Sequence, residues 1–141
     1  MSDYQNIVFA TDFSEHSNRA TTRALQIAAA SGARITVLHV VTYVPPAYAG
    51  VEIPKRYASG DYLRNQAEGH LEVWCKENGL ADCKRVVRTG PAKRVIEEAT
   101  SELGADLLII GASGETGLVK AFGSVAGHVA QRVECDVLLV R

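Results

Sequence analysis

The sequence predicts one α/β domain, a three-layer α/β/α sandwich around a five-stranded parallel sheet with strand order 3-2-1-4-5. Its length of 141 residues, with 47% hydrophobic and 22% charged residues, suits a single globular domain over 1–141. Short unbroken apolar runs alternate with segments of helical periodicity along the chain. Because right-handed crossovers return each strand parallel to the last, this alternation places helices on both faces of the sheet.

The first half of the chain predicts two strands and two helices. Apolar runs at 7–10 and 35–41 predict buried strands. Ser14 is expected to cap the helix between them, and Gly32 to end it. The stretch 42–60 predicts an irregular segment, which could be a lid over a site, a loose excursion or a subunit contact. Helical spacing then resumes to about residue 78.

The second half predicts three more strands. The run 84–89 is more polar and is therefore expected near an edge of the sheet. Pro91 is expected at the first position of the next helix, which Gly104 ends. A buried strand is predicted at 107–110, and a last, apolar strand at 137–140 is expected at the other edge of the sheet.

A glycine-rich loop follows the fourth strand. Gly111, Gly114 and Gly117 interrupt the chain, and Ser124 is expected as the N-cap of a helix over 125–133. Glycines let a ligand approach the backbone, and the first turn of a helix offers unpaired N–H groups, so this arrangement suits a phosphate. The glycines could equally be turn residues without a ligand.

The predicted strand order brings Asp12 near this loop. Asp12 follows the first strand and Gly111 ends the fourth, and the carboxyl ends of these neighbouring strands flank the point where α/β sheets bind ligands. A carboxylate here could accept hydrogen bonds from ribose hydroxyls or hold Mg²⁺ between phosphates. Alternatively, Asp12 could simply cap the first helix together with Ser14.

Several other classes of protein are disfavoured. The glycine spacing matches neither a P-loop nor a dinucleotide fingerprint. The formal net charge of −1 indicates no nucleic-acid partner, and no apolar run is long enough to cross a bilayer. The three cysteines and four histidines lack metal-ligand spacing, and the cysteines are expected to be reduced. The absence of a leader-like N-terminus leads us to expect a cytoplasmic protein.

Four segments in chain order resemble the universal stress protein family. They are Ile7-Val8-Phe9-Ala10-Thr11-Asp12-Phe13-Ser14, Val37-Leu38-His39-Val40, Thr89-Gly90-Pro91, and Gly111-x-x-Gly114 through Gly123-Ser124-Val125. The resemblance covers essentially the whole chain. It implies an adenine nucleotide alpha hydrolase-like fold and a homodimer formed through the C-terminal strand, Val137 to Val140.

Members of the family with the motif Gly-x2-Gly-x9-Gly-Ser/Thr bind ATP, and this chain is similar to them. In this resemblance Asp12 would meet the ribose and phosphates, Val40 would pack on adenine, and Gly123, Ser124 and Val125 would hold the phosphates. The implied site residues are Ala10, Thr11, Asp12, Val40, Ile110, Gly111, Gly114, Gly123, Ser124 and Val125. Mg²⁺ is expected with ATP, without assigned protein ligands.

The chain departs from the family motif at one place. Only eight residues separate Gly114 from Gly123, where the motif has nine. One lost hydrogen bond to a charged phosphate, at about 1.5 to 3 kcal/mol, would weaken binding roughly tenfold to a hundredfold. Lys120 lies in this shortened segment and is either a compensating phosphate ligand or a solvated surface lysine.

These features lead us to expect a nucleotide-binding regulatory protein of the stress response. The glycine loop contains no arginine or glutamine to support phosphoryl transfer, so at most slow ATP hydrolysis is expected. The alternative is a dimeric interaction module that binds ATP weakly or takes another small ligand. A nucleotidyl transferase or ATP pyrophosphatase is disfavoured because the His-x-Gly-His and Ser-Gly-Gly-x-Asp-Ser elements are absent.

Overall fold

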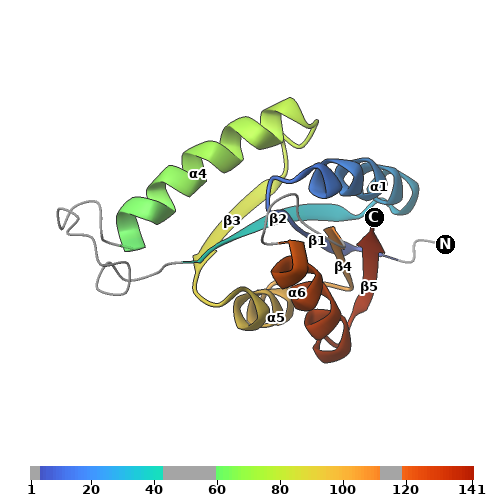
Figure 1. Ribbon diagram of the computed structural model, residues 1–141. Coiled ribbons are helices and arrows are strands. Elements are labelled where there is room, and N and C mark those ends of the chain that lie inside the picture. Colours follow the sequence, from blue (N-terminus) through green and yellow to red (C-terminus); the bar gives the residue numbers. More distant parts are fainter. Residues whose placement is uncertain (1–3, 43–59, 112–118) are drawn as a thin grey trace, which may run out of the picture.

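Strands and helices alternate throughout the computed structural model, which describes residues 4–42, 60–111 and 119–141 (Figure 1). In chain order the elements are β1 (Asn6–Ala10), α1 (Glu15–Ser31), β2 (Arg34–Val41), α4 (Gly60–Glu77), β3 (Lys84–Thr89), α5 (Ala92–Glu102), β4 (Leu107–Gly111), α6 (Val119–Arg132) and β5 (Asp136–Val140). The predicted strands and helices are therefore confirmed, apart from the boundaries given below.

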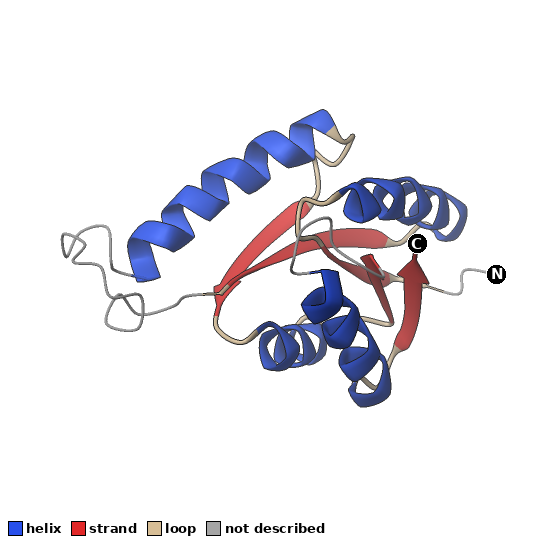
Figure 2. Cartoon of the chain, in the orientation of Figure 1, coloured by secondary structure: helices blue, strands red, loops and turns tan. Residues whose placement is uncertain are grey.

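The strands form one parallel sheet in the order β3-β2-β1-β4-β5, as predicted. Helices α1 and α4 cover one face, and α5 and α6 cover the other (Figure 2). The three-layer α/β/α sandwich is thus confirmed. Both short apolar strands in the middle of the sheet, β1 and β4, are covered on both faces, which explains why their sequences lack polar alternation.

Each face of the sheet carries its own hydrophobic core. On the α1 and α4 face, Phe9 and Ile109 pack with Trp74. On the α5 and α6 face, Val8 and Leu108 pack with Val129. Successive residues of β1 and β4 therefore point to opposite cores, as the two-residue period of a strand requires.

Helix ends largely follow the predicted signals. The Ser14 side chain accepts a hydrogen bond from the Ser17 N–H, and Gly32 ends α1 with φ of 74°. The position predicted for Pro91 is wrong by one residue, because Pro91 has an extended ψ of 124° and precedes the first helical residue, Ala92. The chain leaves β3 through Gly90 at φ 143°, where an added Cβ would lie 2.9 Å from Cγ2 of Val95, so a further extended residue is needed before α5 begins.

The predicted start of the last helix is also wrong. Helix α6 begins at Val119, so Ser124 lies inside it and is not its N-cap. The prediction took Ser124 as an N-cap, but a single glycine before it costs a helix only about 1 kcal/mol, and the preceding Lys120 and Ala121 are good helix formers. Helix formation therefore extends across the Gly-Ser pair.

Two predicted loops fall mainly or wholly outside the described residues. Residues 43–59 make up most of the stretch predicted to be irregular, and residues 112–118 include Gly114 and Gly117. The suggested roles of the first stretch, and the role of Gly114 in a ligand site, stay predictions.

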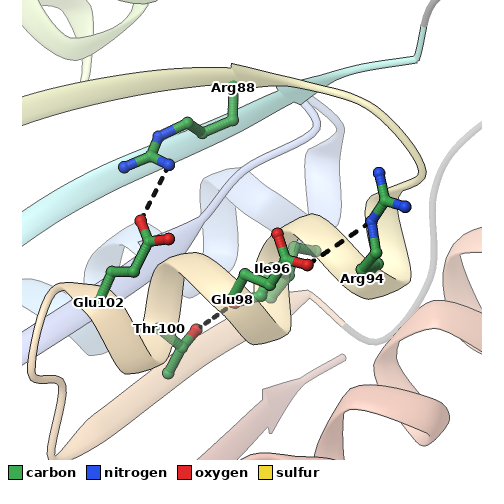
Figure 3. Close-up of polar contacts among 6 residues, drawn as sticks. All are labelled: Arg88, Arg94, Ile96, Glu98, Thr100 and Glu102. Atoms are coloured by element: carbon green, nitrogen blue, oxygen red, sulfur yellow. Dashed lines mark hydrogen bonds and ion pairs between the residues drawn. The ribbon is translucent and has the colours of Figure 1, made fainter.

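Helix α5 makes one ion pair with the edge strand β3 and further polar contacts within itself (Figure 3). Nη1 of Arg88 lies 3.0 Å from Oε2 of Glu102, and within α5 Nε of Arg94 lies 3.7 Å from Oε1 of Glu98. The buried hydroxyl of Thr100 donates to the carbonyl of Ile96 at 2.6 Å. The two ion pairs are exposed and each contributes about 1 kcal/mol or less, so packing, not charge, holds α5 on the sheet.

The cysteines are free thiols in the structure. Cys75 is fully buried in the α1 and α4 core, and this burial raises the pKa of its thiol to about 11. Cys75 is therefore a packing residue and not a nucleophile at neutral pH. Across 4–42, 60–111 and 119–141, no helix combines the length and the apolar character needed to cross a membrane.

Candidate functional site

The carboxyl ends of β1 and β4 lie side by side, as predicted. Ala10 pairs with Ile110 across these strands, and Asp12 follows one strand while Gly111 ends the other. The Thr11 N–H donates to the carbonyl of Leu38 at 2.9 Å, which extends the pairing of β1 with β2 toward the loop. The chain adds β2 and β3 on one side of β1 and then β4 and β5 on the other, and α/β folds bind ligands where the order of strands reverses in this way.

Four of the predicted site residues share one apolar cluster on the α5 and α6 face. Ala10, Ile110 and Val125 are buried in it, and the half-buried Val40 packs against it. Val40 comes from β2 and Val125 from α6, so three strands and one helix supply this apolar floor. A partly exposed valine beside buried alanine and isoleucine side chains suits contact with a flat, apolar ligand surface.

Asp12 organises the turn between β1 and α1. Its Oδ1 accepts hydrogen bonds from the Ser14 N–H at 3.0 Å and from the Ser17 hydroxyl at 3.2 Å. The Asp12 N–H in turn donates to the Ser17 Oγ at 3.2 Å. The alternative that Asp12 acts together with Ser14 at the start of the first helix is therefore supported. The side chain remains half-buried, and within 4–42, 60–111 and 119–141 no residue donates a hydrogen bond to Oδ2.

The remaining predicted residues are located only in part. Thr11 is buried, and its Oγ1 accepts from the Phe13 N–H at 3.0 Å. Gly123 and Ser124 lie within α6, and Gly114 lies outside the described residues. In a helix that starts at Val119, the N–H groups without intrahelical partners belong to its first four residues. Phosphate contacts by Gly123, Ser124 and Val125 stay a prediction.

Phe13 lies at the centre of an aromatic cluster on the opposite face of the sheet. Its ring centroid is 4.3 Å from that of His39 in β2, 4.2 Å from that of His70 in α4, and 5.9 Å from that of Trp74. The backbone of Phe13 has a φ of 65°, the left-handed region that bulky residues rarely adopt. We refer to Phe13, His39, His70 and Trp74 as the Phe13 cluster.

His39 joins the Phe13 cluster to the site loop. Its Nδ1 lies 2.8 Å from the carbonyl oxygen of Thr11. Since a carbonyl only accepts, Nδ1 carries the proton. Burial lowers the pKa of His39, while the hydrogen bond to Thr11 opposes this shift. Its imidazole is therefore neutral at pH 7, with the proton on Nδ1.

The sequence did not identify Phe13 as a residue that shapes the site. Trp74 of α4 is buried, whereas His70 on the same helix is exposed and stacks on Phe13. Their spacing of four residues on one helix face was a usable signal that an aromatic partner packs there. The left-handed backbone of Phe13 could not be predicted from the sequence, because glycine and asparagine are the residues that commonly adopt it.

Two substitutions of Phe13 are expected to separate its ring from its backbone. Phe13→Gly should be more stable than Phe13→Ala by about 1 kcal/mol, because glycine alone relieves the left-handed conformation while both lose the ring. Chemical denaturation of the two variants measures this difference. Alanine is the more stable of the two at ordinary positions, so an alanine variant equal to or above the glycine variant would contradict the strain.

Known proteins are similar to this chain over almost its whole length. The model of the universal stress protein family matches residues 3–141. The universal stress protein A homolog 1 of Coxiella burnetii is 30% identical over 138 residues, which cover 97% of this chain and 96% of the relative.

Solved structures agree with the fold. A universal stress protein in complex with cAMP superposes with a TM-score of 0.69 at 29% identity, covering 99% of each chain. The universal stress protein from Archaeoglobus fulgidus in complex with dAMP superposes with a TM-score of 0.65 at 19% identity over the whole of both chains. The second likeness supports the fold alone.

Proposed function

Because this chain belongs to the universal stress protein family, we propose that it binds an adenine nucleotide, ATP with Mg²⁺, at the carboxyl ends of β1, β2 and β4. Occupancy of this site would regulate a cytoplasmic homodimer in the stress response. The free cysteines suit such a reducing compartment.

A carboxylate beside apolar side chains at the carboxyl ends of the strands supports the binding of a nucleotide. The half-buried Asp12 carboxylate follows β1 at the end of the sheet where Ala10, Val40 and Ile110 form an apolar floor. A nucleoside needs this pairing, since its base packs on apolar side chains and its ribose hydroxyls donate to a carboxylate. The relative of 29% identity that was solved with cAMP supports an adenine nucleotide as the ligand.

The proposed role is regulatory and not catalytic. Among the residues that the structure places around the β1 and β4 ends, Asp12 already accepts two hydrogen bonds within its own turn. Both bonds are accepted by Oδ1 and fix the orientation of the carboxylate, which suits Oδ2 to hold a ribose hydroxyl or a bound cation. Slow hydrolysis is the most that the proposal allows.

Asp12→Asn is the substitution that tests the site. Asparagine keeps an oxygen for the Ser14 N–H and the Ser17 hydroxyl, so the turn should survive while the negative charge is lost. Affinity for ATP should fall about tenfold to a hundredfold, because a hydrogen bond to a charged group contributes about 1.5 to 3 kcal/mol. Calorimetric titration with ATP, ADP and cAMP, with and without Mg²⁺, measures this change.

Asp106→Asn is the matched control. Oδ1 and Oδ2 of Asp106 accept from the N–H groups of Asn6 and Gln5 at 3.0 and 2.8 Å, at the opposite end of the sheet. This substitution should lower stability and leave nucleotide affinity unchanged. Wild-type protein that takes up none of the three nucleotides at millimolar concentration would contradict the proposal, as would equal losses in the two variants.

The second candidate, a dimeric interaction module, is favoured by the contrast between the two edges of the sheet. The edge strand β3 carries Lys84, Arg85 and Arg88, which protect an open edge from pairing. The edge strand β5 has the sequence Asp-Val-Leu-Leu-Val, and Leu139 in it is 43% exposed. An apolar edge of this kind suits pairing with a second copy about a two-fold axis.

A further inference from the structure

The Phe13 cluster has a sandwich geometry. The rings of His39 and His70 are inclined to the Phe13 ring by only 32° and 22°, with centroids 4.3 and 4.2 Å away. Two nearly parallel rings at these distances cannot occupy the same face of a phenyl ring without overlapping. Phe13 therefore lies between the two imidazoles, one from strand β2 and one from helix α4.

The cluster is connected directly to the loop that carries Asp12. Nδ1–H of His39 donates to the Thr11 carbonyl at 2.8 Å, and Phe13 follows Asp12 in the chain. The loop is thus held on both sides of Asp12, by a hydrogen bond before it and by ring stacking after it. The left-handed backbone of Phe13 is a strained conformation for a bulky residue, so the tertiary contacts of its ring add to the local hydrogen bonds of Thr11 and Asp12 in maintaining it.

We propose that His39 is a positioning residue for the nucleotide site: its bond to Thr11 and its contact with Phe13 hold the Asp12 turn in place, and His70 links this turn to α4. The inference rests on the proposed function for its consequence, the affinity for an adenine nucleotide. Its structural content, the position of the 11–14 backbone, is independent of any ligand.

The link to α4 makes the turn sensitive to that helix. His70 is exposed, and a surface hollow of about 710 Å³ beside α4 is lined by Phe13, His39 and His70 together with Val41, Leu63 and Val73. Solvent therefore reaches the cluster from this side. A displacement of α4 would remove the His70 ring from Phe13 and loosen the turn that presents Asp12.

Protonation of His39 adds a proton at Nε2 and leaves the Nδ1–H bond to Thr11 in place, so it acts through the burial of the charged ring. The titratable groups that face it are Asp12, whose charge favours the protonated form, and His70, whose charge disfavours it. Burial dominates, and the pKa of His39 is lowered from its ordinary value of 6.5. The neutral ring therefore contributes stability that is complete above about pH 6.5 and is lost as the pH falls below 6.5 toward the lowered value.

Two variants of similar shape separate the hydrogen bond from the packing. His39→Asn keeps an amide nitrogen where Nδ1 stands, and His39→Leu places a methyl group there. In ligand-free protein at pH 7, backbone amides of 12–14 should exchange about threefold to tenfold faster in His39→Leu than in His39→Asn, because both variants lose the ring contact with Phe13 and only His39→Leu also loses the hydrogen bond. Hydrogen exchange read by NMR gives these rates. Equal exchange in His39→Leu and wild type would overturn the proposal.

The consequence for binding is measured by calorimetry with ATP from pH 5.5 to 8. Affinity should be about threefold to tenfold weaker in His39→Leu than in His39→Asn, because only asparagine keeps the hydrogen bond to Thr11. Below about pH 6.5, wild type should lose thermal stability that His39→Asn retains, because the charged imidazole is buried and asparagine does not titrate. Protonation of ATP and of other histidines affects both proteins, so the difference reports on His39. Identical pH profiles would contradict the role of protonation.

The two measurements also separate the two proposals. Wild-type protein that binds no nucleotide, but shows the expected exchange difference, would overturn the proposed function and leave the positioning role intact. A nucleotide that binds His39→Leu as tightly as wild type, with unchanged exchange, would overturn the positioning role and leave the nucleotide site intact.

Discussion

Replacing Leu108 by alanine is expected to lower the free energy of unfolding by about 2 to 5 kcal/mol. Leu108 is fully buried in β4, between β1 and β5, and it packs in the α5 and α6 core. The loss combines the burial of a leucine side chain with the cavity that it leaves. Since a domain of this size is stabilised by only about 5 to 15 kcal/mol, the variant should be near its limit of stability. Urea denaturation followed by circular dichroism measures the change.

Leu25→Ala is the matched control for this substitution. Leu25 is 36% exposed on α1, and alanine has the higher helix propensity, so the same change should alter stability by about 1 kcal/mol or less. Similar losses in Leu25→Ala and Leu108→Ala would show that the central strand is not as tightly packed as the structure indicates.

Replacing Leu139 by lysine is expected to convert a homodimer to a monomer. If two β5 edges pair about a two-fold axis, each substitution appears twice and brings like charges together. Repulsion and lost apolar contact of about 3 kcal/mol would raise the dimer dissociation constant about a hundredfold. Light scattering should give twice the 15.2 kDa mass of the chain for wild type and that mass for the variant.

Val73→Lys is the control for the charge itself. Val73 is 53% exposed on α4, which packs on β2 and β3 at the edge of the sheet opposite to β5, so Val73→Lys should leave the dimer intact. A wild-type monomer at micromolar concentration, or dissociation by Val73→Lys, would contradict pairing through β5. The calorimetric test of Asp12 does not depend on this result, because the described part of that site comes from one chain.

Much of the candidate site could be predicted because its residues lie at the ends of strong strand signals. The run Leu107 to Ile110 and the run Ile7 to Ala10 could only be buried strands, and their order in the chain placed their carboxyl ends together. Asp12 and Gly111 were therefore expected to lie close together, at the carboxyl ends of two adjacent strands. The start of α6 could not be predicted, since a Gly-Ser pair either starts a helix or continues one at a difference of about 1 kcal/mol.

The sequence by itself determined the parallel sheet, its strand order, the capping of α1 at Ser14 and the chemical character of the two edges, because periodicity and turn residues act locally. Only the tertiary structure decided that Phe13 takes a left-handed backbone between His39 and His70. These three residues come from a loop, a strand and a helix far apart in the chain, and the intrinsic preference of a phenylalanine disfavours that conformation. Packing between distant elements outweighs the strain at Phe13, which is why the sequence alone gave no sign of it.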